Sequence, residues 1–286
     1  TLENGLTIIV REDHSAPVVS AHAWAMTGSI HEGRWLGAGL SHVLEHMLFK
    51  GSSRYGDHRT AFQEHGADFN AETSVDHTVY YETLLATPDN LRFALDLEAD
   101  RMLSARLSDR ELQSEFSVVR NELEIGENSP HEVLLQRLLR VAYAWHGYGR
   151  DTIGSRSDIE RVPIDRLRVF YRQYYQPDNA TLIVAGGFDR AAALRHIGSL
   201  FGSLPRPSRK LHPTYTVEPV QDGERGATVR RVGDVQVVGV AYHGVAAADP
   251  EFAAAEAAVD VLTHEATGRV YRALVETKQA TGLKAE

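Results

Sequence analysis

The segment that most restricts the possible folds runs from 37 to 50, where two histidines flank a glutamate in the string His42-Val43-Leu44-Glu45-His46. The segment is rich in Leu, His and Met, contains no Pro and is followed by a glycine, which predicts a helix. Residues four apart lie one turn above each other on a helix, so both imidazoles project from one face and can share a tetrahedral metal ion. A second element must therefore pack beside this face and supply a further ligand.

The composition limits what such a ligand can be. The 286 residues contain no cysteine, which excludes disulfides and thiolate ligands, so His, Asp or Glu must hold the metal. Glu45 lies one residue before the second histidine, about 100° round the helix. There it can reach a metal-bound water without being directed at the metal itself. The order of residues is the inverted form of the His-Glu-x-x-His zinc motif.

A third ligand is expected on the helix that follows Ser108. Ser108 and Glu111 form the pattern of a capping box, which predicts that a helix begins here. This helix offers Glu115 and Glu122, which are seven residues, or two turns, apart and therefore share a face. Either could complete a catalytic zinc site, which has three protein ligands and one open water position. Periodicity alone does not decide between the two glutamates.

The rest of the chain alternates strand-like and helix-like segments, with hairpin-like neighbours among them. Ser157 and Glu160 form a second capping-box pattern. The pattern predicts the α+β class, with a mixed, mostly antiparallel sheet packed with helices. Strands are predicted at 6–12, 18–26, 78–85, 180–185 and 234–242, and further helices at 88–104, 190–201 and 250–264.

The composition shifts to Pro, Ser, Arg, Lys and Gly from 202 to 226, which is typical of a linker between domains. We therefore expect a complete first domain at 1–205, a linker at 206–226 and the truncated start of a second domain at 227–286. Thr1 directly precedes a predicted strand, so a start Met and any signal peptide are expected to be missing.

The second block loosely repeats the first at an offset of about 218 residues. This offset places Asp260, Thr263 and His264 where the first block has its two histidines and its glutamate. A homologous second domain of this kind could not hold zinc.

The charge of the chain excludes some partners. The formal net charge is −9 and no cluster of Lys and Arg stands out, which argues against nucleic acid and against an anionic membrane surface. No apolar run approaches the roughly 18 residues that a membrane span needs. We therefore expect a soluble protein.

Several stretches resemble the pitrilysin and mitochondrial-processing-peptidase family of inverted-motif zinc peptidases. The core motif is matched by "GLSHVLEHMLFKGSSRYG", with Val43 where an aromatic residue is common. In that family the third ligand is a glutamate about 76 residues beyond the second histidine, which selects Glu122. An acidic residue seven positions earlier, matched by Glu115, supports the site rather than binding the metal. The resemblance covers essentially the whole chain, and its further matches are "GADFNAETSVDHTVYY", "HGYGRDTIGS", "YYQPDNATLIVAGGFD" and "EPVQDGER".

The resemblance implies a zinc-dependent endopeptidase that hydrolyses peptides or unfolded polypeptides, with Glu45 as the general base. It implies that Asn70 and Ala71 lie on an edge strand that pairs with an extended peptide substrate. Taken as residues alone, Asn70 also fits a turn before a strand. The family further implies a second homologous half or subunit, in a homo- or heterodimer, and a bacterial cytoplasm or periplasm.

Two alternatives compete with a peptidase. One is a non-catalytic structural or partner subunit of the same fold, and the other is a zinc hydrolase that acts on esters. The two histidines, Glu122 and Glu45 are all intact, which argues against the first. Bound zinc with peptide cleavage would reject the first, and a panel of peptides against small-ester substrates would separate the second.

Overall fold

The computed structural model describes residues 1–214 and 216–285 of the chain. These residues form two compact units, Thr1–Gly239 and Val240–Glu286, and each unit is described by itself. The first unit contains every predicted site residue.

One five-stranded sheet organises the first unit, in the order β1-β5-β2-β4-β3. β1 pairs with β5 in parallel, whereas β2 with β5, β2 with β4 and β3 with β4 pair antiparallel. The predicted mixed, mostly antiparallel sheet is therefore confirmed. The strands are β1 (Thr7–Glu12), β2 (Val18–Ala25), β3 (Asp68–Thr73), β4 (Thr78–Leu85) and β5 (Ala180–Gly186).

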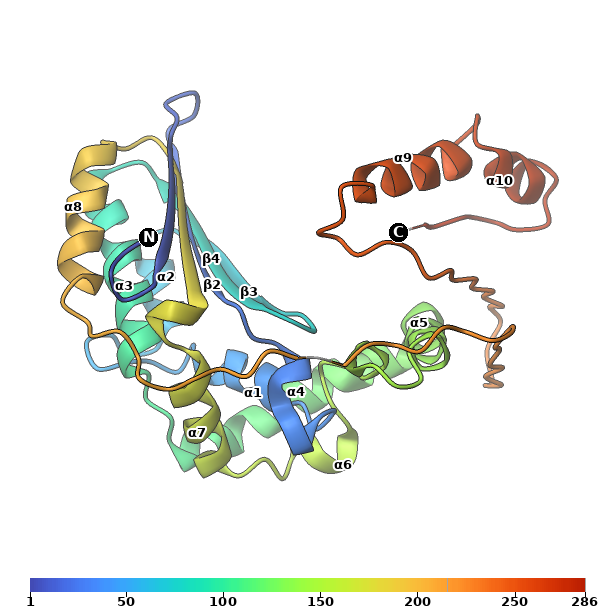
Figure 1. The fold of residues 1–286 in the computed structure, drawn as a ribbon, viewed down its shortest axis with the longest axis horizontal. Helices are drawn as coiled ribbons and strands as arrows, with labels where there is room; N and C mark the ends of the chain where they lie inside the picture. Colours follow the sequence, from blue (N-terminus) through green and yellow to red (C-terminus); the bar gives the residue numbers. More distant parts are fainter. Residues whose placement is uncertain (215, 286) are drawn as a thin grey trace. The chain divides into compact units, whose positions relative to one another are not determined.

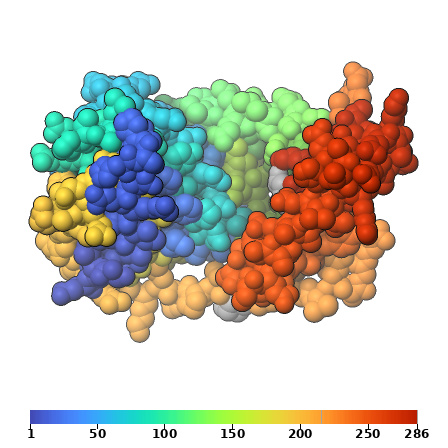
Figure 2. All heavy atoms as spheres, turned by 90° about the horizontal axis from the view of Figure 1, so that it is seen from above, coloured from blue at the N-terminus to red at the C-terminus, as the bar shows by residue number. Residues whose placement is uncertain are grey.

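Helices cover one face of the sheet, and α2, α3 and α8 lie along it in Figure 1. The space-filling view shows the N-terminal segment, in blue, directly beside the yellow residues of β5 and α8 (Figure 2). A second group, α1, α4 and α7, packs together near one end of the sheet. The main helices of the unit are α1 (Leu40–Met47), α2 (His58–Glu64), α3 (Pro88–Ser104), α4 (Asp109–Asn128), α5 (Pro130–Ala142), α6 (Arg156–Ile159), α7 (Ile164–Tyr174) and α8 (Arg190–Phe201).

Short 3-10 turns connect several of these elements, namely η1 (Ser29–Trp35), η2 (Gly147–Gly149) and η3 (Pro177–Asn179). Side-chain caps explain where the long helices begin. The Thr87 hydroxyl accepts the Asn90 N–H at 3.1 Å at the start of α3, and Ser108 accepts the Glu111 N–H at 3.2 Å at the start of α4. Each such cap stabilises its helix by about 1 kcal/mol, because it satisfies a donor that has no partner within the helix.

All eight residues of α1 are buried. Val43, Leu44 and Met47 are fully inaccessible and belong to the core of the unit. Burying a side chain of this size stabilises the fold by roughly 1.5–3 kcal/mol. The helix that carries the predicted metal ligands is therefore held from several sides.

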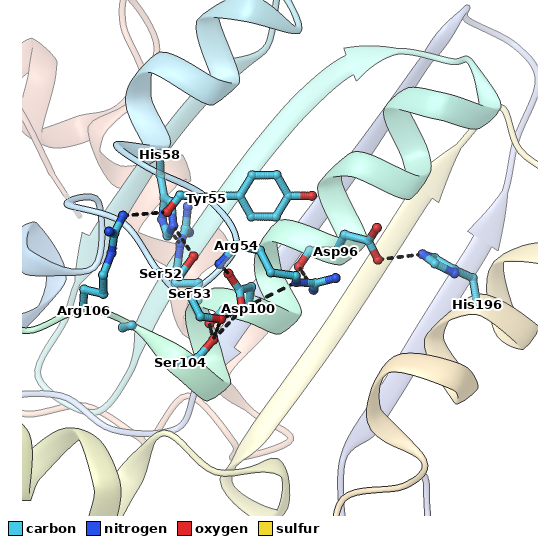
Figure 3. Close-up of polar contacts among 12 residues, drawn as sticks. Ser52, Ser53, Arg54, Tyr55, His58, Asp96, Asp100, Ser104, Arg106 and His196 are labelled. Atoms are coloured by element: carbon cyan, nitrogen blue, oxygen red, sulfur yellow. Dashed lines mark hydrogen bonds and ion pairs between the residues drawn. The ribbon is translucent and has the colours of Figure 1, made fainter.

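The loop after α1 is fastened to α3 through Asp100 (Figure 3). The Ser53 hydroxyl donates to Asp100 at 2.8 Å and the Arg54 N–H donates to it at 2.7 Å. Burial opposes the charged form of Asp100, but hydrogen bonds from Ser104 and from the Arg54 backbone lower its pKa to about 2. A charged Asp100 thus fastens the loop that follows α1 to α3.

The segment after α8 stays on the first unit and is held by Glu218. Its carboxylate accepts three consecutive backbone N–H groups, those of Ala144, Trp145 and His146, at 3.0, 2.9 and 2.8 Å. Successive N–H groups of this kind form a concave site for an anion. The hydrogen bond from His146 and its neighbours holds the pKa of Glu218 below its usual range.

Two of the elements predicted from the sequence are wrong. Ser157 does not cap a helix, because it lies inside α6, and the next helix, α7, begins after Pro163. Residues 234–242, all described, form no strand. Val235, Val238 and Tyr242 are largely exposed, because no described strand lies beside this segment to pair with it.

The second unit contains α9 (Phe252–Thr263), α10 (Arg269–Tyr271) and the π-turn η4 (Arg272–Glu276). The predicted helix at 250–264 is thus confirmed, although none of the residues of α9 is buried. Among the described residues, no helix is both long enough and apolar enough to cross a membrane.

Candidate metal centre

The two histidines of α1 meet on one face of the helix. Their ring centroids are 4.8 Å apart and their planes are nearly perpendicular, at 82°. Both residues are buried, at 7% exposure for His42 and 9% for His46. The packing of α1 in the core leaves these imidazoles few alternative rotamers, so their Nε2 atoms are directed together.

Glu122 reaches this pair from α4. Its Oε1 lies 3.4 Å from His42 Nε2 and its Oε2 lies 3.3 Å from His46 Nε2. Two metal–ligand bonds of about 2.05 Å at a tetrahedral angle hold the ligand atoms about 3.3 Å apart. One ligand atom from each of these three residues lies within 4.8 Å of the others, and the group is the candidate metal site of the described residues. The spacing fits a zinc ion without a large rearrangement.

The charge around the histidines also suits a cation. Burial opposes a charged His46, but hydrogen bonds to Glu115 and Glu122 raise its pKa to about 9. Hydrogen bonds from His42 and His46 hold the pKa of Glu122 well below its usual range. Anionic carboxylates thus favour positive charge at the imidazoles, and a zinc ion can supply that charge in place of a proton.

Glu115 lies on the opposite side of the His46 ring from Glu122. Its Oε2 is 3.3 Å from His46 Nδ1, and its Oε1 forms an ion pair with Lys50. Its side chain is only 2% exposed, whereas that of Glu122 is 50% exposed. Burial opposes its ionisation, but His46 and Lys50 lower its pKa. The two glutamates on this face of α4 therefore have different positions. Glu122 lies at the Nε2 atoms of both histidines, whereas Glu115 lies at Nδ1 of His46.

Glu45 is not a member of the His42, His46 and Glu122 group. Its Oε2 accepts a 2.6 Å hydrogen bond from the hydroxyl of Thr73, the last residue of β3. Nothing in the sequence pattern singled out Thr73. Its contact depends on how β3 lies against α1, which neither periodicity nor local propensity describes.

The two remaining predicted site residues lie on β3, at an edge of the sheet. Asn70 is the third residue of this strand, so the interpretation of it as a turn residue is wrong. The Ser74 N–H donates to the His77 carbonyl at 2.8 Å, which makes this a hydrogen-bonded pair. Bonded and non-bonded pairs alternate along an antiparallel ladder, so the backbone groups of Asn70 face β4 and those of Ala71 face the open edge.

Comparison with known proteins decides the family. The model of the insulinase family, peptidase family M16, matches residues 7–156, and the model of the M16 inactive domain matches residues 161–286. The chain belongs to peptidase family M16.

The relatives of this M16 chain include named zinc proteases. The zinc protease PqqE of Helicobacter pylori is 32% identical over 82% of the chain and 53% of its own length. The uncharacterized zinc protease YmxG of Bacillus subtilis is 31% identical over 71% of the chain and 49% of its own length. The chain thus spans about half the length of the curated relatives it matches.

A solved structure agrees with the fold. The crystal structure of a protease from Helicobacter pylori matches 98% of the M16 chain and 68% of its own chain, with a TM-score of 0.84 and 27% identity. The mixed sheet with its helices is therefore the M16 fold. The relatives are zinc proteases and a His-His-Glu group lies close together here, so the predicted cofactor, zinc, is confirmed. A protease role is supported at the level of the family.

The boundary between the segments matched by the two M16 models lies at α6, so it divides the strands of the one sheet between the two segments. β5 belongs to the segment matched by the second model, yet it pairs with β1 and β2 from the first. The part of the second model up to α8 is therefore needed to complete the sheet beside which α1 packs.

Proposed function

We propose that this chain is the zinc-binding part of an endopeptidase that hydrolyses peptides or unfolded polypeptides. His42, His46 and Glu122 would hold the zinc. The observation that carries this proposal is that one ligand atom from each of these residues lies within 4.8 Å of the others, with a Glu122 oxygen 3.3 or 3.4 Å from each Nε2 atom.

When bound, zinc supplies a water of lowered pKa and polarises the carbonyl of the scissile bond. Glu45 acts as the general base, taking a proton from the attacking water and giving it to the leaving amine. The Thr73 hydrogen bond occupies one oxygen of Glu45 and leaves the other to accept this proton. Burial of Glu45 at 8% exposure keeps bulk water from competing for it.

Glu115 acts as a positioning residue in this proposal. It holds Nδ1 of His46, so that Nε2 is the nitrogen left for the metal. Lys50 in turn balances the buried charge of Glu115. A ligand histidine whose outer nitrogen is fixed loses less rotational freedom when the metal binds.

The open edge of β3 is the proposed substrate surface. An extended peptide can add a strand there, with its backbone bonded to the outward N–H and carbonyl of Ala71 and with the exposed Asn70 side chain near it. The same strand ends at Thr73, which contacts Glu45. A peptide on this edge would therefore run toward the catalytic base. This mode requires an unfolded substrate.

We further propose that segment 206–226 links the sheet domain, 1–205, to the start of a second homologous domain at 227–286. The chain spans about half of its relatives, so full activity is expected to need a second half or subunit, covalent or separate. Residues 260, 263 and 264 carry no His-Glu-His set, so that half would not bind zinc itself.

The test combines metal content with turnover. One zinc per chain should bind, and the protein complete with its second half should cleave an unfolded peptide in preference to small-ester substrates. Glu45→Gln should keep the zinc while turnover falls at least ~10²-fold, the usual scale for a general base. Loss of zinc in Glu45→Gln would show that base and ligand are wrongly assigned, and ester cleavage without peptide cleavage would reject the peptidase.

A further inference from the structure

A cavity with a mixed apolar and charged lining lies outside the metal group, between η1, the start of α1 and the segment that joins α6 to α7. Its volume is about 390 Å³. This volume is within the range of pockets that bind small molecules or a few side chains. Three arginines line it together with Trp35, namely Arg34 and, from a distant part of the sequence, the neighbouring Arg161 and Arg166.

Two of the three guanidinium groups, those of Arg34 and Arg166, lie over the indole ring of Trp35. The guanidinium carbon of Arg34 is 5.2 Å from the centroid of Trp35, and that of Arg166 is 5.4 Å from it. Cation–π contacts of this kind hold guanidinium groups in place without using their N–H donors. The donors of Arg34 and Arg166 therefore remain available to a ligand.

No ion pair within 4.0 Å joins these three arginines to a carboxylate among the described residues. Other arginines nearby do have partners. Glu160, next to Arg161 in sequence, pairs with Arg120, and Asp165, next to Arg166, pairs with Arg168. The nearest acidic residues along the chain are thus engaged elsewhere, although the chain has a net charge of −9.

The lining of the cavity defines what it can bind. One carboxylate, Asp158, lines it against three arginines, so positive charge predominates. Leu40 and Val162 are buried beneath it and give it an apolar floor. Guanidinium groups bind carboxylate and phosphate in pairs of parallel hydrogen bonds, and an apolar floor strengthens such contacts by excluding water.

We propose that this cavity binds a compact anion with two or more carboxylate or phosphate groups. One group would lie between Arg161 and Arg166, and a second would reach Arg34. The anion could be a free polycarboxylate or phosphate, or adjacent acidic side chains of a peptide, because both present the same oxygens. The proposal does not depend on the peptidase function, since none of the lining residues belongs to the metal group.

The experiment is a titration of the zinc-loaded protein, complete with its second half and carrying Glu45→Gln to prevent turnover. The probes are citrate, inorganic phosphate and the capped peptides Glu-Glu-Glu and Gln-Gln-Gln, with binding followed by calorimetry. We expect citrate or the acidic peptide to bind and the amide peptide not to bind. Citrate binding alone assigns a free anion, and peptide binding alone assigns acidic side chains.

The deciding variant is Arg161→Gln with Arg166→Gln, which should weaken binding at least about tenfold, the scale of one lost charge-assisted hydrogen bond. The matched control is Arg92→Gln with Arg195→Gln, which removes the same charge from exposed positions on α3 and α8. The control should bind as the parent does. Equal weakening in both double variants, or no binding of any probe, would overturn the proposal.

Discussion

The helices α1 and α9 follow similar strand-then-helix patterns in the sequence, yet they have very different surroundings. All eight residues of α1 are buried, whereas none of the residues of α9 is buried. α1 has a sheet, the helix α4 and the edge strand β3 beside it. The comparison teaches that histidines on a helix become a metal centre only when neighbouring elements orient and complete them.

The largest expected effect is the loss of zinc when a ligand on α1 is removed, and the corresponding position at the end of α9 provides the control. His46→Ala leaves two of the three proposed ligands, so tight zinc binding should be lost. Glu122→Gln should have the same result, since an amide oxygen is a weaker ligand without charge. His264→Ala is the matched control and should keep one zinc per chain by metal analysis. If His46→Ala still bound one zinc per chain, the metal site would lie elsewhere in the protein.

The next effect concerns packing. Leu44→Ala removes a fully buried side chain from α1 and should lower the free energy of unfolding by about 2–5 kcal/mol. Leu262→Ala in α9 affects a side chain that is 42% exposed, and it should change that free energy by no more than about 0.5 kcal/mol. Urea unfolding followed by far-UV circular dichroism measures both, since the three tryptophans all lie in the first unit and would not report on α9. Equal costs would mean that α9 is as well packed as α1.

A smaller effect is expected from the residue behind His46. Glu115→Gln keeps the shape of the side chain but weakens its hold on His46 Nδ1 and removes the charge paired with Lys50. Zinc affinity or turnover should fall roughly 10- to 100-fold without emptying the site. Competition with a chelator measures the affinity. If Glu115→Gln bound no zinc, Glu115 rather than Glu122 would be the metal ligand.

Much of α1 and α4 could be predicted because their signals are local. The spacing of His42, His46 and Glu122 follows from helix periodicity and from a resemblance that covers both segments. The caps at Thr87 and Ser108 are also local, and the structure has them. Periodicity does not decide between Glu115 and Glu122, which share one face of α4. The difference between them is the nitrogen of His46 that each one faces.

The failures and omissions depend on contacts between distant segments. Residues 234–242 have the composition of a strand, but a strand needs a partner, and none of the described strands provides one. The structure does not follow the capping pattern at Ser157, because Ser157 lies inside α6 and the next helix begins only after Pro163. The cavity with Arg34 and Arg166 joins segments more than a hundred residues apart, so no local pattern indicates it.

The smallest effect tests the contact between α1 and β3, which α9 lacks. Thr73→Val keeps the branched shape but removes the hydroxyl that donates to Glu45 at 2.6 Å. A lost hydrogen bond to a charged group is worth about 1.5–3 kcal/mol, and water entering at the half-buried Thr73 can restore part of it. Turnover should therefore fall about tenfold, mainly in kcat, while zinc content is unchanged.

The control for this prediction is Thr73→Ser, which restores the donor and should recover most of the activity. The loss should lie in kcat rather than in KM, because the Thr73 hydroxyl contacts the base and not the substrate. A purely structural role would follow the shape of the side chain, so Thr73→Val would then keep activity and Thr73→Ser would lose it. If Thr73→Val keeps the parent's kcat, Glu45 is oriented by α1 alone, and the edge strand contributes only to substrate binding.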